Sequence, residues 1–127
     1  MKNSKLPPRE FTIFEYLYRD ASNYKVWGTL LLNGVANESD HQVLVSRFES
    51  GELFIAEQLN IPALYAELWE FSSGPTDDDH VWHTFHALRA PTPDDTCTEV
   101  FSSVVDLVEK IKSVKEWQTE LSPHWDI

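Results

Sequence analysis

Two stretches separated by a short polar segment constrain the fold of this chain more than any other feature. The first, from Phe11 to Arg19, reads FTIFEYLYR, and the second, from Tyr24 to Leu32, reads YKVWGTLLL. Both are rich in aromatic and β-branched residues, which favour strands, and the residues between them have turn chemistry. Apolar side chains occupy both faces of the first stretch. The pair therefore predicts an antiparallel hairpin whose first strand is covered on both faces.

Signals for two helices follow the hairpin. Ser39 with Gln42 fits a capping box, and Gly51 suits the left-handed position after a helix, so the first helix is predicted over 39–50. Asn60 followed by Pro62 predicts the start of a second helix. That helix ends before the Ser-Ser-Gly-Pro segment at 72–75, which breaks regular structure.

A third helix is predicted over 97–115. Thr96 with Glu99 fits another capping box, and apolar residues then repeat at helical spacing from Val100 to Ile111. Two further strands are predicted, a short one over 52–58 and another over 80–88. They complete the set of elements that the patterns indicate.

Taken together, these elements predict one α+β domain spanning residues 1–127. Its sheet is small and mostly antiparallel, with about four strands and about three helices in the order β-β-α-β-α-β-α. The length and an apolar fraction of 42% suit one domain with a real core. Residues 1–9 are predicted to form a loose N-terminal arm and residues 117–127 an irregular C-terminal tail.

The net charge of −11 is unevenly distributed, because residues 48–99 alone carry a balance of −10. Such a field repels nucleic acid and membranes and attracts basic proteins. No window approaches 18 apolar residues, and the N-terminal residues lack the apolar segment of a signal peptide. Cys97 is the one cysteine, so an internal disulfide is excluded. These features predict a cytoplasmic protein that binds neither nucleic acid nor membranes directly.

The densest concentration of reactive side chains is the stretch TDDDHVWHTFHAL, Thr76 to Leu88. Carboxylates and imidazoles together suit a divalent metal or acid–base chemistry. In a strand, however, His80 and His86 would face one way and His83 the other, and the first two would lie about 20 Å apart. No metal site is therefore predicted, although one ligand from Asp77–Asp79 with His80 stays open. The alternative is that the aspartates bond turn N–H groups.

Three blocks of the sequence, YRDASNYK, FIAEQLNIP and DDHVWHTF, resemble a family of small uncharacterised bacterial proteins. The resemblance covers about residues 13–90 and implies no activity, cofactor or partner. It does suggest that the polar and aromatic residues of these blocks share one binding surface or one buried network. The residues concerned are Tyr18, Arg19, Asp20, Asn23, Tyr24, Asp78, His80, Trp82 and His83.

The function predicted from these observations is a non-enzymatic binding or interaction module for a basic protein partner, a nucleic-acid charge mimic among the forms it could take. No cofactor is predicted, since phosphate-binding, nucleophile-elbow and zinc motifs do not occur. The alternative is a small hydrolase, with or without a metal, that uses the stretch from Asp77 to His83. In it, Asp79 and His80 would be the acid–base pair or metal ligands, and Arg19 would hold an anion. A subunit of a larger assembly is a third interpretation, and the oligomeric state stays open.

Overall fold

A computed structural model describes residues 10–19, 25–64, 82–95 and 99–119 of the chain. The predicted N-terminal arm and most of the predicted C-terminal tail lie outside these ranges. The elements in chain order are β1 (Phe11–Arg19), β2 (Lys25–Asn33), α1 (Glu38–Arg47), β3 (Leu53–Ile55), the 3-10 helix η2 (Ala56–Leu59), β4 (Trp82–Arg89), β5 (Val100–Ser103) and α3 (Val104–Lys112).

The strands form one five-stranded sheet in the order β3-β4-β1-β2-β5. β1 pairs with β2 along its whole length, from Phe11 opposite Asn33 to Arg19 opposite Lys25, which confirms the predicted hairpin. β4 pairs antiparallel with both β1 and β3, whereas β5 runs parallel to β2. The predicted α+β class is thus confirmed, but the described sheet is mixed and has five strands rather than about four. The described ranges also hold two α-helices rather than about three.

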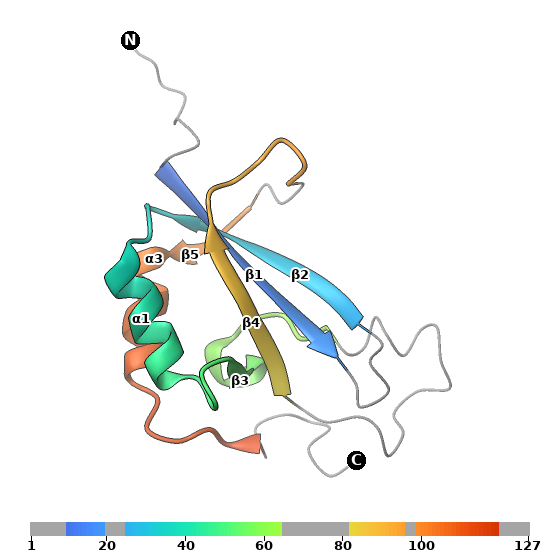
Figure 1. The fold of residues 1–127 in the computed structure, drawn as a ribbon, viewed down its shortest axis with the longest axis vertical. Coiled ribbons are helices and arrows are strands. Elements are labelled where there is room, and N and C mark those ends of the chain that lie inside the picture. The colour runs from blue at the N-terminus through green and yellow to red at the C-terminus, as the bar shows by residue number, and fades with distance from the viewer. Residues whose placement is uncertain (1–9, 20–24, 65–81, 96–98, 120–127) are drawn as a thin grey trace.

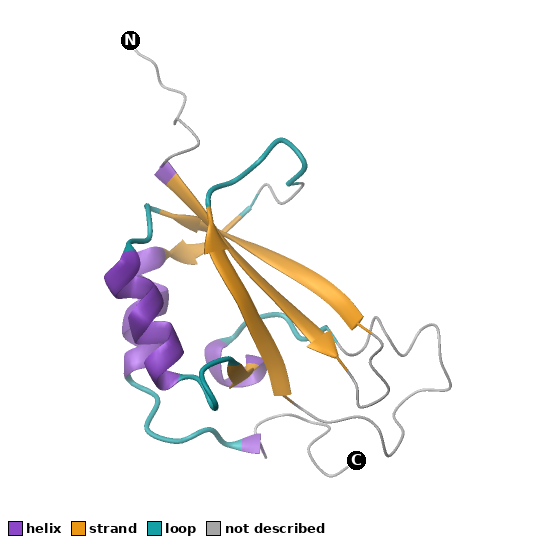
Figure 2. Ribbon diagram, in the orientation of Figure 1, coloured by secondary structure: helices purple, strands orange, loops and turns teal. Residues whose placement is uncertain are grey.

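α1 and α3 pack against each other on one side of the sheet (Figures 1 and 2). The core lies between these helices, η2 and the facing surface of the sheet, which we call the core face. β1 contributes Phe14, Tyr16 and Tyr18 to it, and α3 contributes Leu107 and Ile111. Both sets follow the period of their element, two for the strand and about four for the helix.

The opposite surface of the sheet, which we call the outer face, carries the other residues of β1. Ile13 and Leu17 are buried there as well, so both faces of β1 are covered, as predicted. Their direct cross-strand neighbours include Arg89 of β4 and Trp27 of β2. Long side chains on adjacent strands thus flank the middle of this face.

The predicted first helix begins and ends earlier than its pattern suggested. Asn37 caps α1, and its capping box is completed by Asp40, not by Ser39 with Gln42. Asn and Asp accept backbone N–H groups as well as Ser and Gln do, so two overlapping candidate boxes competed. Gly51 does adopt a positive φ of 83°, but in a turn after the helix has ended at Arg47.

The predicted helix start at Asn60 is wrong. Asn60 adopts left-handed geometry with φ 59° and terminates η2, and residues 61–64 are not helical. Asparagine tolerates left-handed geometry, so it can end a helix as readily as it begins one. The rest of this predicted helix lies outside the described residues. The predicted strand over 52–58 is shortened accordingly to β3.

The predicted helix over 97–115 begins too early. Residues from Val100 to Ser103 form β5, and Ser103 caps α3 by accepting the backbone N–H of Asp106 at 2.9 Å. The apolar spacing is helical only from Val104 onward, and hydrogen bonds to β2 determine the conformation before it. After α3, Trp117 packs its ring on Phe48 and donates Nε1–H to the Arg47 carbonyl oxygen at 3.0 Å.

Candidate functional site

The predicted site residues are only partly within the described ranges. Tyr18, Arg19, Trp82 and His83 are described. The residues outside are Asp20, Asn23, Tyr24, Asp77, Asp78, Asp79 and His80. The predicted acid–base pair of Asp79 with His80, and any metal ligand from that loop, therefore stay predictions.

His83 lies on the core face and is fully buried. Its Nε2 accepts the backbone N–H of Leu64 at 2.9 Å, so in the neutral ring the proton is on Nδ1. The rings of Tyr18 and Phe54 lie 5.4 and 6.0 Å from it. Tyr16 makes a second hydrogen bond to the same segment, because its O–H donates to the Pro62 carbonyl oxygen at 2.7 Å. These bonds fasten the segment that follows η2 to the sheet.

The other two predicted site residues lie apart from this buried group. Arg19 ends β1 and is exposed, opposite Lys25. Trp82 begins β4, opposite Ile55, and is half-buried. The structure therefore brings Tyr18 together with His83 and places Arg19 at the end of a strand on the outer face. The cross-strand neighbour of Arg19 is the cationic Lys25, and this pair alone does not define an anion-binding site.

The outer face carries a row of polar and aromatic side chains that the sequence pattern alone did not single out. His86 is 53% exposed, and its Nε2 lies 3.9 Å from Oε1 of Glu15. The ring of Trp27 meets the His86 ring edge-to-face at 5.1 Å and 87°. Trp27 is itself 50% exposed. An aromatic ring, an imidazole and a carboxylate from three adjacent strands thus meet on one open surface.

A β-bulge places His86 in this row. Phe85 lies opposite Tyr16 and Ala87 lies opposite Glu15, so His86 is the extra residue of β4. A bulge adds twist and changes the direction of a side chain. As predicted, His83 and His86 point to opposite faces of the sheet.

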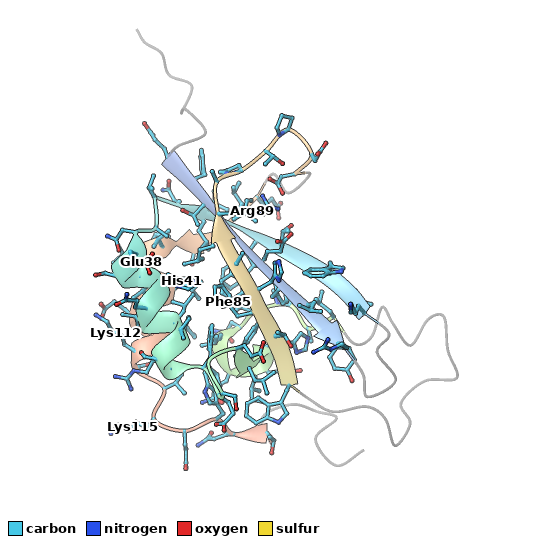
Figure 3. All side chains as sticks on the ribbon, in the orientation of Figure 1. Glu38, His41, Phe85, Arg89, Lys112 and Lys115 are labelled. Carbon is cyan, nitrogen blue, oxygen red and sulfur yellow. The ribbon has the colours of Figure 1, made fainter. Side chains whose placement is uncertain are left out.

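Arg89 extends the row at the end of β4 (Figure 3). Its guanidinium donates to both carboxylate oxygens of Asp95 at 2.8 and 2.9 Å and lies 3.4 Å from Oε2 of Glu15. The hydrogen bond to Asp95 raises the pKa of Arg89 well above its ordinary value. The Arg89 guanidinium, and then the Thr92 N–H, hold the pKa of Asp95 well below its usual range.

The electrostatic balance of this row is negative. Two carboxylates, Glu15 and Asp95, share the single guanidinium of Arg89, so one negative charge is left over. Asp95 is only 10% exposed and takes the two short bonds, whereas Glu15 is 24% exposed and makes the longer contact. The surplus charge is therefore presented to solvent mainly at Glu15, beside His86.

A hollow of about 470 Å³ lies where the start of β1, the end of β4 and the N-terminal turn of α1 meet. His41 reaches from α1 toward β4, and its ring lies 5.8 Å from that of Phe85 (Figure 3). Asn37 and Asp40 already engage each other's backbone N–H groups at this helix end. The backbone N–H groups that these side chains accept are therefore not available to an anion in the hollow.

Metal chemistry gains no support from the described part of the chain. Within it, no three His, Cys, Asp or Glu side chains are grouped so that they could hold one ion. A separation of 3.9 Å between His86 and Glu15 is also longer than a hydrogen bond. What the outer face offers instead is contact area, one surplus negative charge and an aromatic ring, which are means of recognition.

The described ranges form a small α+β fold in which two α-helices lie on one side of a curled mixed sheet. No helix in the described ranges is long and apolar enough to cross a membrane. No protein-family model matches the chain, and searches of curated proteins and of solved structures gave no match. The resemblance to small bacterial proteins accordingly stays a prediction.

Proposed function

We propose that this protein is a non-enzymatic interaction module that binds a basic protein partner through the outer face of its sheet. The observation that carries the proposal is Trp27, half exposed on that face and in ring contact with His86. A tryptophan in this setting contributes a large apolar contact area with little conformational entropy to lose. Three aromatic residues of β1, Phe14, Tyr16 and Tyr18, are buried in the core, whereas half of the surface of Trp27 is exposed.

Charge supports the choice of partner. The chain carries a net −11, and the Glu15–Arg89–Asp95 group adds one unbalanced carboxylate beside Trp27. A cationic side chain of the partner would find an aromatic face and a carboxylate within one patch, and both attract it. The earlier predictions of a cytoplasmic location and of no direct nucleic-acid binding are part of this proposal and rest on the same charge and on the single cysteine.

The alternative prediction of a small hydrolase is not developed further. Of its three named residues, Asp79 and His80 lie outside the described ranges, and Arg19 is exposed next to Lys25. The hydrolase therefore stays a prediction that concerns the acidic loop alone.

The experiment that tests the proposal is affinity capture of cellular proteins on the full chain at low and high salt, about 50 and about 500 mM. Wild type is compared with Trp27→Ala and with a matched control, Val105→Ala, whose side chain is 68% exposed on α3. We expect one or more basic proteins that are lost at high salt and on Trp27→Ala but retained by the control. A partner set unaffected by Trp27→Ala would contradict the proposal.

A further inference from the structure

The edge of the sheet next to Trp27 is only partly covered. β2 runs from Lys25 to Asn33, but β5 pairs with it only at Leu31, Leu32 and Asn33. Along Lys25–Leu30, β2 pairs with β1 on one side, and no described strand pairs with it on the other side. In Figure 1 this stretch is the lower part of the light-blue strand β2, which extends away from β5. Among the described residues, it therefore forms an unpaired edge of six residues.

The direction of the backbone groups on this edge follows from the ladder. The Phe85 N–H donates to the Glu52 carbonyl oxygen, away from β1, although Phe85 lies opposite Tyr16. Phe85 and Tyr16 are therefore a pair that exchanges no hydrogen bonds, and the N–H and C=O of Tyr16 point to the other side, toward its partner Gly28 on β2. Along an antiparallel strand these directions alternate from one residue to the next. On β2 the neighbours of Gly28, which are Trp27 and Thr29, consequently direct their groups outward, and so does Lys25.

We propose that a basic, extended segment of the partner adds to the sheet as a further strand along Lys25–Leu30 of β2. The inference rests on the proposed function and specifies how the partner binds. Backbone N–H and C=O groups repeated at every second residue recognise an extended chain, whose own groups repeat at the same interval of about 6.8 Å. An exposed strand edge without charge or proline at its centre is otherwise a liability for a protein.

Charge distinguishes a basic partner from a second copy of this chain. Two copies would each bring a net −11 to the contact and repel each other. A cationic strand gains from the same field. Lysine placed opposite Thr29 is well positioned, because Thr29 is short and Glu15 lies directly across from it on β1. The added strand would lie about 9.6 Å from β1, a span that a lysine and a glutamate side chain can bridge together.

Trp27 contributes the second half of the recognition. Its side chain lies on the outer face, the same side as Thr29, and half of its surface is free for contact. A lysine or arginine on the added strand can lie over this ring, which attracts cations through its π-system. Lys25, at the far end of the edge, opposes a basic residue there. The cationic positions of the partner are therefore expected beside Thr29 and Trp27 rather than beside Lys25.

The test uses a synthetic peptide of about nine residues in which lysine alternates with valine, titrated against the full chain. Two readouts are followed: the dissociation constant, and the hydrogen-exchange rates of the Trp27 and Thr29 amides. We expect binding that slows exchange at both amides. A peptide of the same sequence with alternate backbone nitrogens methylated keeps its charge but loses its strand donors, and we expect it to bind about tenfold more weakly.

Two variants at one position provide the matched comparison. Thr29→Pro removes an outward N–H that the ladder to β1 does not use, so we expect the variant to fold, while Thr29→Ala keeps the N–H. We expect Thr29→Pro to weaken peptide binding about tenfold and Thr29→Ala to leave it within about twofold. The methylated peptide decides the question independently if Thr29→Pro does not fold.

The outcomes separate the inference from the proposed function. Equal binding of the plain and methylated peptides, with loss on Trp27→Ala, would overturn strand addition and leave a side-chain contact on the outer face. No binding of either peptide, together with partner capture that survives Trp27→Ala, would overturn both. Dimerisation of the wild-type chain in sedimentation, abolished by Thr29→Pro, would assign the edge to a second copy and overturn the choice of a basic partner.

Discussion

His83 and His86 are three residues apart on the same strand, yet their surroundings have almost nothing in common. His83 is fully buried, accepts the Leu64 N–H and packs among aromatic rings. His86 is half exposed, touches Trp27 at its edge and lies 3.9 Å from a carboxylate of Glu15. One belongs to the core face and the other to the outer face of one sheet.

The difference shows how a single strand supplies both stability and recognition. On the core face, His83 Nε2 and the Tyr16 hydroxyl each bond a backbone group of the segment after η2, because burial of polar groups without partners is costly. On the outer face, the side chains of Glu15 and Trp27 are partly exposed and can contact solvent or a partner. The comparison predicts that substitutions on the core face change the free energy of unfolding, whereas substitutions on the outer face change binding.

The largest expected effect is at His83. His83→Ala removes the acceptor of the buried Leu64 N–H and leaves a cavity among Tyr18 and Phe54, so we expect a loss of about 3 kcal/mol in the free energy of unfolding. Denaturant titration measures it. His86→Ala is the control on the same strand and should change stability by less than about 0.5 kcal/mol. Similar losses for both variants would refute the division between the two faces.

Gly28 gives the next largest effect. A Cβ at this position would lie 3.0 Å from Leu64 Cδ2 and from two ring atoms of Tyr16, whose hydroxyl is held by the Pro62 carbonyl oxygen. Gly28→Ala should therefore destabilise the fold by about 1–2 kcal/mol through overpacking on the core face. Thr29→Ala, one residue away on the outer face, is the control with little expected change in stability. An unaltered unfolding midpoint for Gly28→Ala would mean that Leu64 and Tyr16 can shift to accept the added methyl group at no cost in stability.

The sequence predicted the parts of the fold that have a regular period. The hairpin of β1 and β2 followed from alternating strand patterns, and the split of His83 from His86 followed from strand alternation. The sequence failed where two local signals competed. Asn60 could begin or end a helix, and the residues before Val104 carried a helical pattern although pairing with β2 makes them a strand.

The outer-face site was harder to predict, because it depends on contacts between strands that are distant in sequence. Arg89 meets Glu15 across 74 residues, and the bulge at His86 is a property of strand pairing rather than of composition. Once the hairpin register is assumed, Trp27 falls on the same face as Glu15, and an aromatic residue among polar ones on one face is a recognisable signal.

A smaller effect is expected from the ion pair that ends the outer-face row. Arg89 holds the pKa of Asp95 below its usual range, so the unfolded chain takes up a proton at this site at higher pH than the folded one. The resulting stabilisation is present above the ordinary aspartate pKa of about 4 and is lost as the pH falls below it. Because Arg89 is partly exposed, we expect no more than about 1 kcal/mol.

Asp95→Asn tests this pair in both directions. At pH 7 the variant should be less stable than wild type by up to about 1 kcal/mol, and at pH 3 the difference should shrink, since wild type loses its own contribution there. Thermal unfolding at the two pH values measures it. A difference that is independent of pH would mean that folding leaves the pKa of Asp95 unchanged, which would contradict the stabilising contact of its carboxylate with Arg89.

Trp27 is expected to combine a small effect on stability with the largest effect on binding. Half of its surface is exposed, so Trp27→Ala removes the contact with the His86 ring but opens no closed cavity, and we expect a loss of about 1 kcal/mol or less. The matched Trp27→Phe keeps an aromatic face for a cation and should retain part of the affinity for the lysine–valine peptide, whereas Trp27→Ala should lose most of it. Unfolding midpoints and peptide titrations on the same samples compare the two quantities directly. If Trp27→Ala lowers the free energy of unfolding as much as His83→Ala does, the Trp27 ring stabilises the fold. The proposed division between a stabilising core face and a binding outer face would then be wrong.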